Sequence, residues 1–573
     1  MPLASRIALL VIVLVLAACG GGDKEQPQIG PIPGHTGVVS NASFDPQIAV
    51  DGNGNAFAVW AKFDGTRKNI WANRYVAGSG WGRPQMIEND NAGDADLPQI
   101  AFDAAGNAVA IWRHTEIVTA GVPNPSGKVT NCKPSRVAIG GIWVNRYDAI
   151  KQLWAGAQKV ETKDSAVIEI IINPDDSELC KLIAHDAQNP HIAADGKGNF
   201  VAVWEQSDGV RKNIRANRYD AVAGKWGATP DTIEANTADA NSPQIAADGK
   251  GNFVAVWRQI AASSVIPNQY DSVQNKRYNL WGNRYDVASQ RWGGATLVSD
   301  NTLLVAGDPS NPNVNGNADT PHVAMDANGN ALAVWAQSNH IFANRYDAAT
   351  QLWGVAPQFP QSVENNPGWA AAAPRIAMTG GGDALVVWEQ YFDNDPHDHI
   401  PAWKNIRANR YIAGVGWQAA QLIENDDKGH ALTPQAVIDA NGNAIAIWRY
   451  AETVVAKVED DPNTPFACDP RVTIGSIRVN HYDAIRQQWV GAQQVSVQRV
   501  GTENDIVIEE VGSVCKFKTG PRYPDASNPH IALDATGNAL AVWSQSNGVR
   551  TLIDANRYAV GVGWGSAELI EGQ

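Results

Sequence analysis

One sequence pattern recurs eight times along this chain, and it constrains the fold more than any other feature does. Each copy combines a proline, usually an Asp-x-x-Gly-Asn turn, a tryptophan that ends an Ala/Val run, an Asn-Arg-Tyr or Asn-His-Tyr triplet and a second tryptophan. Such self-similarity is typical of solenoids, propellers and other repeat arrays. The landmark prolines are Pro46, Pro98, Pro190, Pro243, Pro321, Pro374, Pro434 and Pro529.

Each unit predicts four short strands separated by turns, with the fourth strand in the stretch that follows the second tryptophan. The second strand, such as Ala331–Trp335, is apolar on both faces, whereas a half-buried strand would alternate apolar and polar residues. We therefore expect every sheet to lie between two neighbouring sheets. This predicts an all-β fold, a single β-propeller of eight four-stranded blades over residues 41–573. Two four-bladed rings, or a ring with a degenerate extra unit, remain open as alternatives.

The lengths of the connections predict one constant and one variable face. From Trp60 to Asn73 the chain takes 13 residues, but from Trp112 to Asn145 the equivalent connection takes 33. The turns within the first and last hairpins of a unit keep a nearly constant length. Both variable connections lie on the same face of a propeller, so we expect every large insertion, and the binding function, on that face.

Four cysteines fall in the insertions of two units. Cys132 and Cys180 lie in the second unit, and Cys468 and Cys515 occupy the equivalent places in the seventh. In an exported protein this arrangement predicts two disulfides, Cys132–Cys180 and Cys468–Cys515. A tetrathiolate zinc site is the alternative, although no Cys-x-x-Cys spacing supports it.

The first residues have the composition of an export signal. Residues 1–18 combine one basic residue with an apolar run too short to span a bilayer. The run ends at Leu16–Cys19 in Leu-Ala-Ala-Cys, which resembles the lipobox of bacterial lipoproteins. This resemblance implies palmitate on Cys19, a tether over residues 19–40 and, with Gly20 next, export to the outer membrane. An ordinary signal peptide with a chance cysteine is the alternative.

The charge of the chain restricts its partners. A formal net charge of −14, without any basic stripe, argues against nucleic acid. We expect instead an envelope protein or a glycan, with membrane contact only through the lipid anchor. The sequence predicts no cofactor.

The residue after each landmark proline begins the strand that lines the central channel of a propeller. These residues are polar, and several can titrate, so they are a candidate site for an anionic or sugar-like ligand near the variable face. A water-filled channel mouth is the alternative. The candidate ring consists of Gln47, Gln99, His191, Gln244, His322, Arg375, Gln435 and His530.

One insertion of the sixth unit is dense in oxygen and nitrogen ligands. If folded back on itself it could bind a divalent metal, and a solvated acidic loop is the alternative. The Asp-x-x-Gly-Asn turns loosely resemble calcium loops, but an aspartate that caps a hairpin turn explains them. The candidate metal ligands are Asp393, Asp395, His397, Asp398 and His399.

The triplet arginine recurs in seven units, and His481 replaces it in the remaining one. An active site needs a catalytic group once, so we expect a structural role, such as pairing with the aspartate that often follows, for example Asp148. A second recurrent strand position is aromatic in four units and Arg or Asp in the others, so we expect it to be partly exposed. The four aromatic residues are Trp71, Trp143, Trp281 and Phe342.

The opening of each unit carries a family resemblance. Its Pro-x-Ile-Ala-x-Asp-x-x-Gly-Asn stretch resembles the opening of NHL-type propeller repeats and is loosely similar to the Asp-box of sialidase-like propellers. The stretch "NIWANRY" is similar to repeats of uncharacterised exported bacterial proteins. These resemblances imply the fold, not an activity. We expect a protein- or glycan-binding scaffold without catalytic residues. The alternative is a sialidase-like glycosidase or a polysaccharide lyase acting on extracellular glycans, although no non-repeated catalytic constellation is visible.

Overall fold

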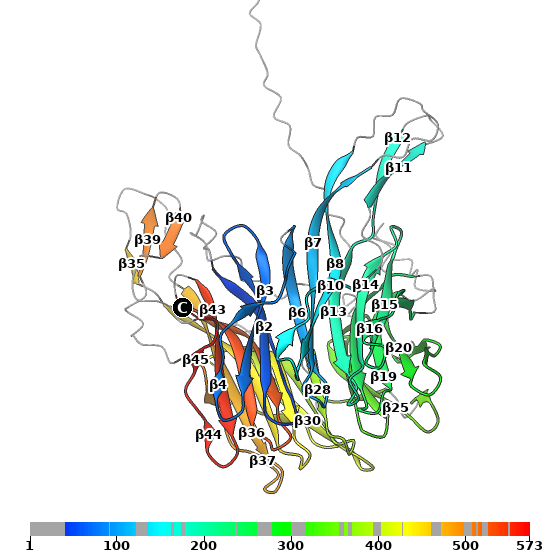
Figure 1. The fold of residues 1–573 in the computed structure, drawn as a ribbon. Helices are drawn as coiled ribbons and strands as arrows, with labels where there is room; N and C mark the ends of the chain where they lie inside the picture. The colour runs from blue at the N-terminus through cyan, green and yellow to red at the C-terminus, as the bar shows by residue number, and fades with distance from the viewer. Residues whose placement is uncertain are drawn as a thin grey trace, which may run out of the picture.

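The computed structural model confirms an all-β ring of eight blades (Figure 1). It describes residues 41–90, 92–121, 134–161, 166–172, 178–234, 238–260, 278–299, 316–354, 360–364, 370–392, 403–426, 428–455, 457–459, 471–497, 507–511, 514–517, 525–547 and 550–572. These residues include no helix with the length and hydrophobicity that a membrane crossing requires.

The innermost strand of each blade contacts the innermost strands of both neighbouring blades. The circuit closes where β1 contacts β41, which confirms a single ring and excludes two separate four-bladed rings. The innermost strands of blades 1 to 8 are β1 (Ser43–Val50), β6 (Asp94–Phe102), β13 (Ala187–Ala194), β18 (Ala240–Ala247), β23 (Ala318–Met325), β28 (Ala371–Met378), β33 (Gly429–Ile438) and β41 (Ala526–Leu533).

The second strand of each blade is buried on both faces, as its continuous apolar run predicts. In β24 every residue is buried, and the tryptophan of each second strand is completely inaccessible to solvent. Small alanines alternate with larger side chains here, so neighbouring sheets can approach closely. The second strands are β2 (Ala56–Phe63), β7 (Ala108–Ala120), β14 (Phe200–Ser207), β19 (Phe253–Ile260), β24 (Ala331–Gln337), β29 (Ala384–Phe392), β34 (Ala444–Val455) and β42 (Ala539–Ser546).

The third strand pairs antiparallel with the second and carries the Asn-Arg-Tyr triplet. In blade 3, for example, Ala202 of the second strand is paired with Asn217. The third strands are β3 (Lys68–Val76), β8 (Ser135–Asp148), β15 (Lys212–Asp220), β20 (Tyr278–Asp286), β25 (His340–Asp347), β30 (Trp403–Ile412), β36 (Arg471–Asp483) and β43 (Thr551–Ala559).

The fourth strand differs from the sequence prediction, which placed it after the second tryptophan. It consists of two short pieces, and the tryptophan itself ends the first piece. The first pieces are β4 (Gly80–Trp81), β9 (Leu153–Trp154), β16 (Lys225–Trp226), β21 (Arg291–Trp292), β26 (Leu352–Trp353), β31 (Gly416–Trp417), β37 (Gln488–Trp489) and β44 (Gly563–Trp564). The second pieces are β5 (Gln85–Met86), β10 (Gln158–Lys159), β17 (Asp231–Thr232), β22 (Thr296–Leu297), β27 (Gln361–Ser362), β32 (Gln421–Leu422), β38 (Gln493–Gln494) and β45 (Glu568–Leu569).

The hydrophobic core is divided among the junctions between blades. One cluster joins Val256 and Leu280 of blade 4 to Trp335 and Phe342 of blade 5, and the other junctions repeat this arrangement. Since each blade buries apolar surface only against its neighbours, the ring as a whole supplies the core that no blade has alone.

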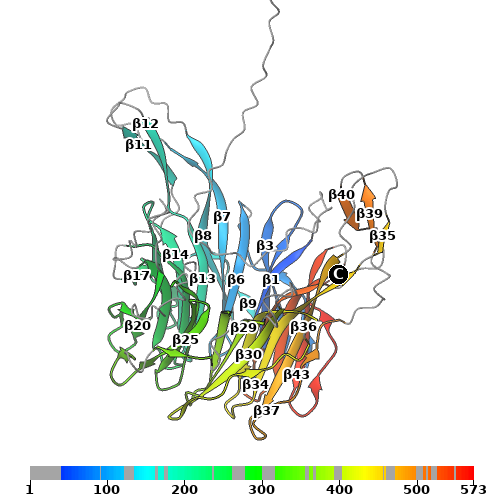
Figure 2. The ribbon, with the colours of Figure 1, turned by 180° about the vertical axis from the view of Figure 1, so that it is seen from behind.

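The large insertions rise from one face, called here the variable face (Figure 1, Figure 2). The hairpin β7–β8 continues beyond the body of blade 2 and is joined by β11 (Ala166–Ile172) and β12 (Glu178–Ala184). The hairpin β34–β36 of blade 7 lies near a sheet of β35 (Lys457–Glu459), β39 (Val507–Val511) and β40 (Val514–Phe517). The opposite face, called the turn face, carries only short turns.

Several predicted residues lie outside the described part of the chain. Cys180 belongs to β12 and Cys515 to β40, on the insertions where they were expected, but their proposed partners are not described, so both disulfides stay predictions. The residues outside are Cys19, Cys132, Cys468, Asp393, Asp395, His397, Asp398 and His399.

Candidate functional site at the centre of the ring

The polar ring predicted from the sequence lies at about the middle of the innermost strands. In β1, Gln47 is the fifth of eight residues, so the ring lies deeper than the variable-face end of the strand. All eight side chains are half-buried. They are Gln47, Gln99, His191, Gln244, His322, Arg375, Gln435 and His530.

A β-bulge in every innermost strand precedes the ring residue. In β1 the register shifts between Phe44, opposite Ala61, and Gln47, opposite Val59, so one extra residue is accommodated there. The residue before each landmark proline has a positive φ of 47° to 54°, although this left-handed region is unfavourable for non-glycine residues. These eight residues are Asp45, Leu97, Asn189, Ser242, Thr320, Ala373, Thr433 and Asn528.

Three contacts connect the ring side chains to the next blade. Gln47 Nε2 lies 2.9 Å from His530 Nε2, and Gln244 Nε2 lies 3.0 Å from His191 Nε2. The backbone N–H of Ile376 donates to His322 Nδ1 at 3.4 Å. Since an amide N–H donates in each glutamine contact, the histidine nitrogen there is an acceptor, which requires a neutral imidazole.

The electrostatics of the ring are dominated by Arg375. Burial lowers the pKa of its guanidinium, and Nη1 donates to the carbonyl of Pro374 at 3.0 Å. Among the described residues no carboxylate lies within ion-pair distance of it, and the charge of Glu389 offsets only part of this lowering. A guanidinium that is partly removed from water without an adjacent anion is unfavourable, so the centre of the ring favours a negatively charged group.

The three ring histidines are held neutral. Burial, followed by the positive charge of Arg375, lowers the pKa of His191 to about 4 and those of His322 and His530 to about 3. These three residues come from blades 3, 5 and 8, so the guanidinium of blade 6 acts across the centre of the ring. At neutral pH the ring therefore presents one cation among neutral donors and acceptors.

The recurrent triplet is structural, and its asparagine is the residue that the sequence analysis undervalued. In each unit this buried side chain donates to a carbonyl at the end of the preceding blade, as Asn217 does to Val160 at 2.9 Å. The eight asparagines are Asn73, Asn145, Asn217, Asn283, Asn344, Asn409, Asn480 and Asn556.

The triplet arginines also connect neighbouring blades. Arg218 pairs with Asp220 at 2.8 Å, as expected, and its guanidinium lies 5.9 Å from the ring centre of Tyr285 in the next blade. Where histidine replaces arginine, His481 packs against Tyr558 at 5.5 Å. The structural interpretation of this position is confirmed by these contacts.

The aspartates of the turn face are satisfied by their own turns. Oδ1 of Asp51 accepts from the backbone N–H groups of Asn53 and Asn55, at 2.8 and 2.9 Å, and Oδ2 accepts from the Asn55 side chain. The predicted capping role is therefore confirmed, and these oxygens are already used within the hairpin.

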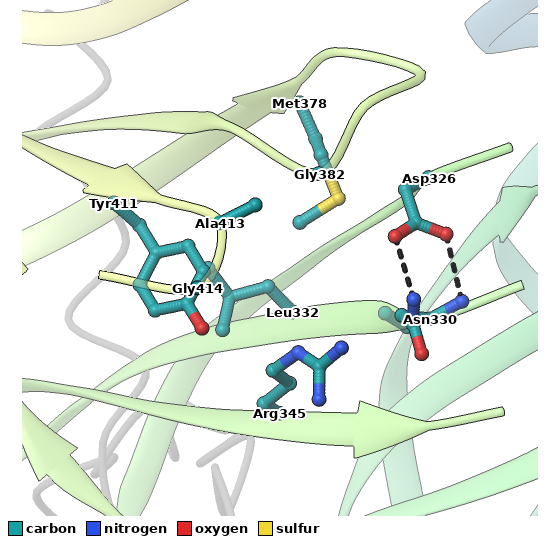
Figure 3. A pocket seen from close by; sticks show the side chains of 10 residues that line it. Asp326, Asn330, Leu332, Arg345, Met378, Gly382, Tyr411, Ala413 and Gly414 are labelled. Atoms are coloured by element: carbon teal, nitrogen blue, oxygen red, sulfur yellow. Dashed lines mark hydrogen bonds between the residues drawn. The ribbon is translucent and has the colours of Figure 1, made fainter. Parts of the chain in front are cut away.

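Two cavities open on the turn face at junctions between blades. One, of about 200 Å³, lies between blades 5 and 6. Figure 3 shows Arg345 and Tyr411 lining it from different strands, near Asp326, which is bonded to Asn330. The other, of about 350 Å³, lies between blades 8 and 1. Both are lined by repeated structural residues, so we place the candidate site at the ring centre instead.

The variable strand position behaves largely as predicted. Trp71, Trp143 and Trp281 are half-buried, whereas Phe342 is buried. Asp554 occupies the same position in blade 8, where burial and then the nearby charge of Glu571 raise its pKa to about 6.

A second cluster, which was not predicted from the sequence, lies between blades 1 and 2. One ligand atom each of Asp90, His114 and Glu116 lies within 4.8 Å of the others. The available signal was the residue two places after the first tryptophan, which is glutamine in five units and His114 in the second.

Comparison with known proteins shows likeness only in the fold. No protein-family model and no curated protein matches the chain. Similar solved structures include an ulvan lyase described as a new family of polysaccharide lyase, at 8% identity and a TM-score of 0.42, covering 72% of this chain and 92% of that one. Another is the α-L-arabinofuranosidase Arb93A of Fusarium graminearum, at 11% identity and a TM-score of 0.33, covering 64% of this chain and 92% of that one. A third is the intramolecular trans-sialidase of Ruminococcus gnavus, at 9% identity and a TM-score of 0.33, covering 71% of this chain and 90% of that one. Nothing about activity follows from likeness at this level.

Proposed function

We propose that this protein binds an acidic glycan at the polar ring in its central channel, which the ligand enters from the variable face. The observation that carries the proposal is Arg375, a half-buried guanidinium among the ring side chains with no carboxylate at ion-pair distance among the described residues. A carboxylate or sulfate group of a ligand would supply the missing anion through a charge-assisted, bidentate contact.

The neutral groups around Arg375 suit the rest of a sugar. Hydroxyl groups both donate and accept hydrogen bonds, and a ring of uncharged imidazoles and glutamine amides offers both functions. The insertions of blades 2 and 7 rise on the same face and extend the surface that a polymer could contact (Figure 1). We therefore favour a glycan over a protein as the ligand.

The predicted lipid anchor at Cys19 gives this proposal its setting. An anchored propeller at the outer membrane would meet acidic polysaccharides of the envelope or its surroundings. This setting is itself a proposal, and loss of membrane association in a Cys19→Ala variant, measured by fractionation, is the outcome expected if it is right.

The test of ligand binding is calorimetric titration with oligosaccharides that differ only in charge. We expect binding of oligouronates and none of neutral oligosaccharides of equal length. Arg375→Gln should weaken binding at least tenfold, Arg375→Lys less, and Arg83→Gln, which changes an exposed arginine, not at all. Equal affinity of the Arg375→Gln variant, or equal binding of neutral sugars, would refute the proposal.

A second candidate function is β-elimination of an acidic polysaccharide. The charge of Arg375 acts on His191, His322 and His530. The guanidinium would neutralise a uronate carboxylate while a neutral imidazole takes the proton from the carbon that bears it. The electron pair of that C–H bond would form the new C=C bond as the glycosidic C–O bond at the next carbon breaks, and the leaving oxygen would take a proton from water. Their low pKa values make them weak bases, which is why we rank binding first. Ultraviolet absorbance of the unsaturated product would distinguish the two, since a binding protein leaves it unchanged.

A further inference from the structure

Carboxylate and imidazole groups gather between blades 1 and 2, away from the ring centre. Asp90 lies in the connection after β5, while His114 and Glu116 lie on β7, and one ligand atom of each falls within 4.8 Å of the others. Glu88, also after β5, places Oε1 3.4 Å from Nδ1 of His114.

Two members of this cluster are buried without hydrogen-bond partners. His114 is 0% exposed and Glu88 is 1% exposed. Among the described residues, neither ring nitrogen of His114 and neither carboxylate oxygen of Glu88 has a partner with hydrogen-bond geometry. Buried polar groups are almost always satisfied, so the imidazole of His114 is available to a further group at this cluster.

The equivalent glutamates at other junctions do have partners. In blade 8, Glu571 pairs with Lys62 at 3.8 Å and accepts from the hydroxyl of Ser43. In blade 5, Glu364 accepts from the backbone N–H of Ile341 at 2.5 Å. The unpartnered state of Glu88 is therefore a property of its own junction and not of the repeat.

At the junction between blades 6 and 7, acids in the equivalent positions are neutralised by a guanidinium. Glu424 and Asp426 occupy the positions of the two acids that follow β5, and Tyr450 that of the histidine. Arg478 lies among them, 3.5 Å from Glu424 and 3.0 Å from Asp426, with its guanidinium 3.5 Å from the centre of the Tyr450 ring.

The junction between blades 1 and 2 lacks this guanidinium. Trp143 occupies the position of the arginine, and its ring lies 5.5 Å from that of His114. Lys159 approaches Glu116 at 3.4 Å, but it also lies 3.6 Å from Glu161, so one cation is shared between two acids. The acids around His114 are therefore left with less positive charge than their counterparts.

We propose that this cluster binds a divalent transition-metal ion, Zn²⁺ in the first instance, in place of the missing guanidinium. His114, Asp90 and Glu116 supply the ligands, and Glu88 is the carboxylate that orients the imidazole. An imidazole among carboxylates favours Zn²⁺ over Ca²⁺, which takes oxygen ligands. Since Zn–N and Zn–O bonds measure roughly 2.0–2.2 Å, ligand atoms around a tetrahedral ion lie about 3.4 Å apart. The three groups, now within 4.8 Å of one another, would have to close by up to about 1.4 Å around the ion.

The position of this site gives the ion a structural consequence. It would join the connection that leaves blade 1 to the base of the β7–β8 hairpin, which rises above the body of blade 2 (Figure 1). The ion would therefore stiffen the root of this hairpin.

The test is equilibrium dialysis of the untagged, chelator-stripped full chain against Zn²⁺, with bound metal counted by mass spectrometry. We expect one equivalent of tightly bound zinc in the native protein. His114→Gln should lose it, and the fold should tolerate this change because glutamine stands at the equivalent position in five other blades. The matched control, His481→Gln, removes a histidine from the turn face and should keep the full equivalent.

A second variant keeps the proposal testable if His114→Gln does not fold. Trp143→Arg supplies the guanidinium found in blade 7, and we expect it to abolish zinc binding while the circular dichroism spectrum is unchanged. Absence of stoichiometric zinc in the native protein, or its retention in Trp143→Arg, overturns the proposal. Equal uptake of Ca²⁺ in competition with Zn²⁺ also overturns it.

Discussion

Replacing the three ring histidines should flatten the dependence of stability on pH. In the folded protein the pKa values of His191, His322 and His530 are about 4, 3 and 3, whereas an unfolded histidine titrates near 6.5. As the pH falls below about 6.5, these histidines therefore bind protons in the unfolded chain but stay neutral in the native ring. Stability is fully present above this pH and declines as the pH falls towards the native pKa values.

The linkage relation sets the size of this effect. At pH 5 an unfolded histidine is almost fully protonated and a native ring histidine almost fully neutral. This difference lowers the free energy of unfolding by about 2 kcal/mol for each residue, relative to its value at neutral pH. Three residues give on the order of 6 kcal/mol, an upper value because the side chains are only half-buried. Asp554, with a pKa of about 6, works in the opposite direction, but it is present in both proteins and cancels in the comparison.

The assay is urea denaturation between pH 7.5 and pH 5, applied to the native protein and to the triple His→Gln variant. Glutamine is a suitable replacement because it already occupies this position in Gln47, Gln99, Gln244 and Gln435. The native protein should lose more stability than the variant on acidification, and His185→Gln, outside the ring, should behave as the native protein does. The same pH slope in the native protein and the triple variant would refute the reasoning.

Three further changes test the junctions and the insertions. Asn217→Ala should cost about 1–3 kcal/mol of unfolding free energy, because the carbonyl of Val160 loses its buried donor; urea denaturation against the native protein measures this. Gly140→Ala should lower the melting temperature by several degrees, since its new Cβ would lie 2.3 Å from the carbonyl oxygen of Ala187, whereas Gly52→Ala, with open space, should not. The two predicted disulfides should leave no free thiol in their four cysteines after denaturation without reductant, and reduction should cost about 3–4 kcal/mol each; four reactive thiols would favour the zinc alternative.

The fold could be predicted from the sequence because the same pattern of turn, apolar run and aromatic residues recurs eight times. The two-sided apolar run around Trp335 has no other stable setting than a sheet between two sheets. The structural role of Arg218 could be predicted because an arginine recurs at this position in seven of the eight units. The split fourth strand could not be predicted, because two-residue pieces carry no periodicity.

The candidate site was only partly visible in the sequence. The ring residues could be aligned from their prolines, but the bulge that precedes them depends on a positive φ at residues as different as Leu97 and Asn528, which no composition signals. The cluster around His114 combines residues of two blades. The sequence alone does not show which side chains of neighbouring blades lie opposite each other, so this cluster could not be predicted from it. The comparison with Tyr450 in the seventh unit distinguishes it, once the structure shows what surrounds that residue.

The ring closes without exchanging a strand between its ends. Blade 1 contains residues 43–86 only and blade 8 residues 526–569 only, so their junction is held by contacts such as Ser43 with Glu571, which lie 528 residues apart. The other seven junctions join consecutive blades. Joining the ends of an unstructured chain of this length costs roughly 5 kcal/mol of entropy, while each blade already formed shortens the effective loop. Assembly can therefore proceed blade by blade as a nearest-neighbour process, and cooperativity around the full circle depends on this single late step.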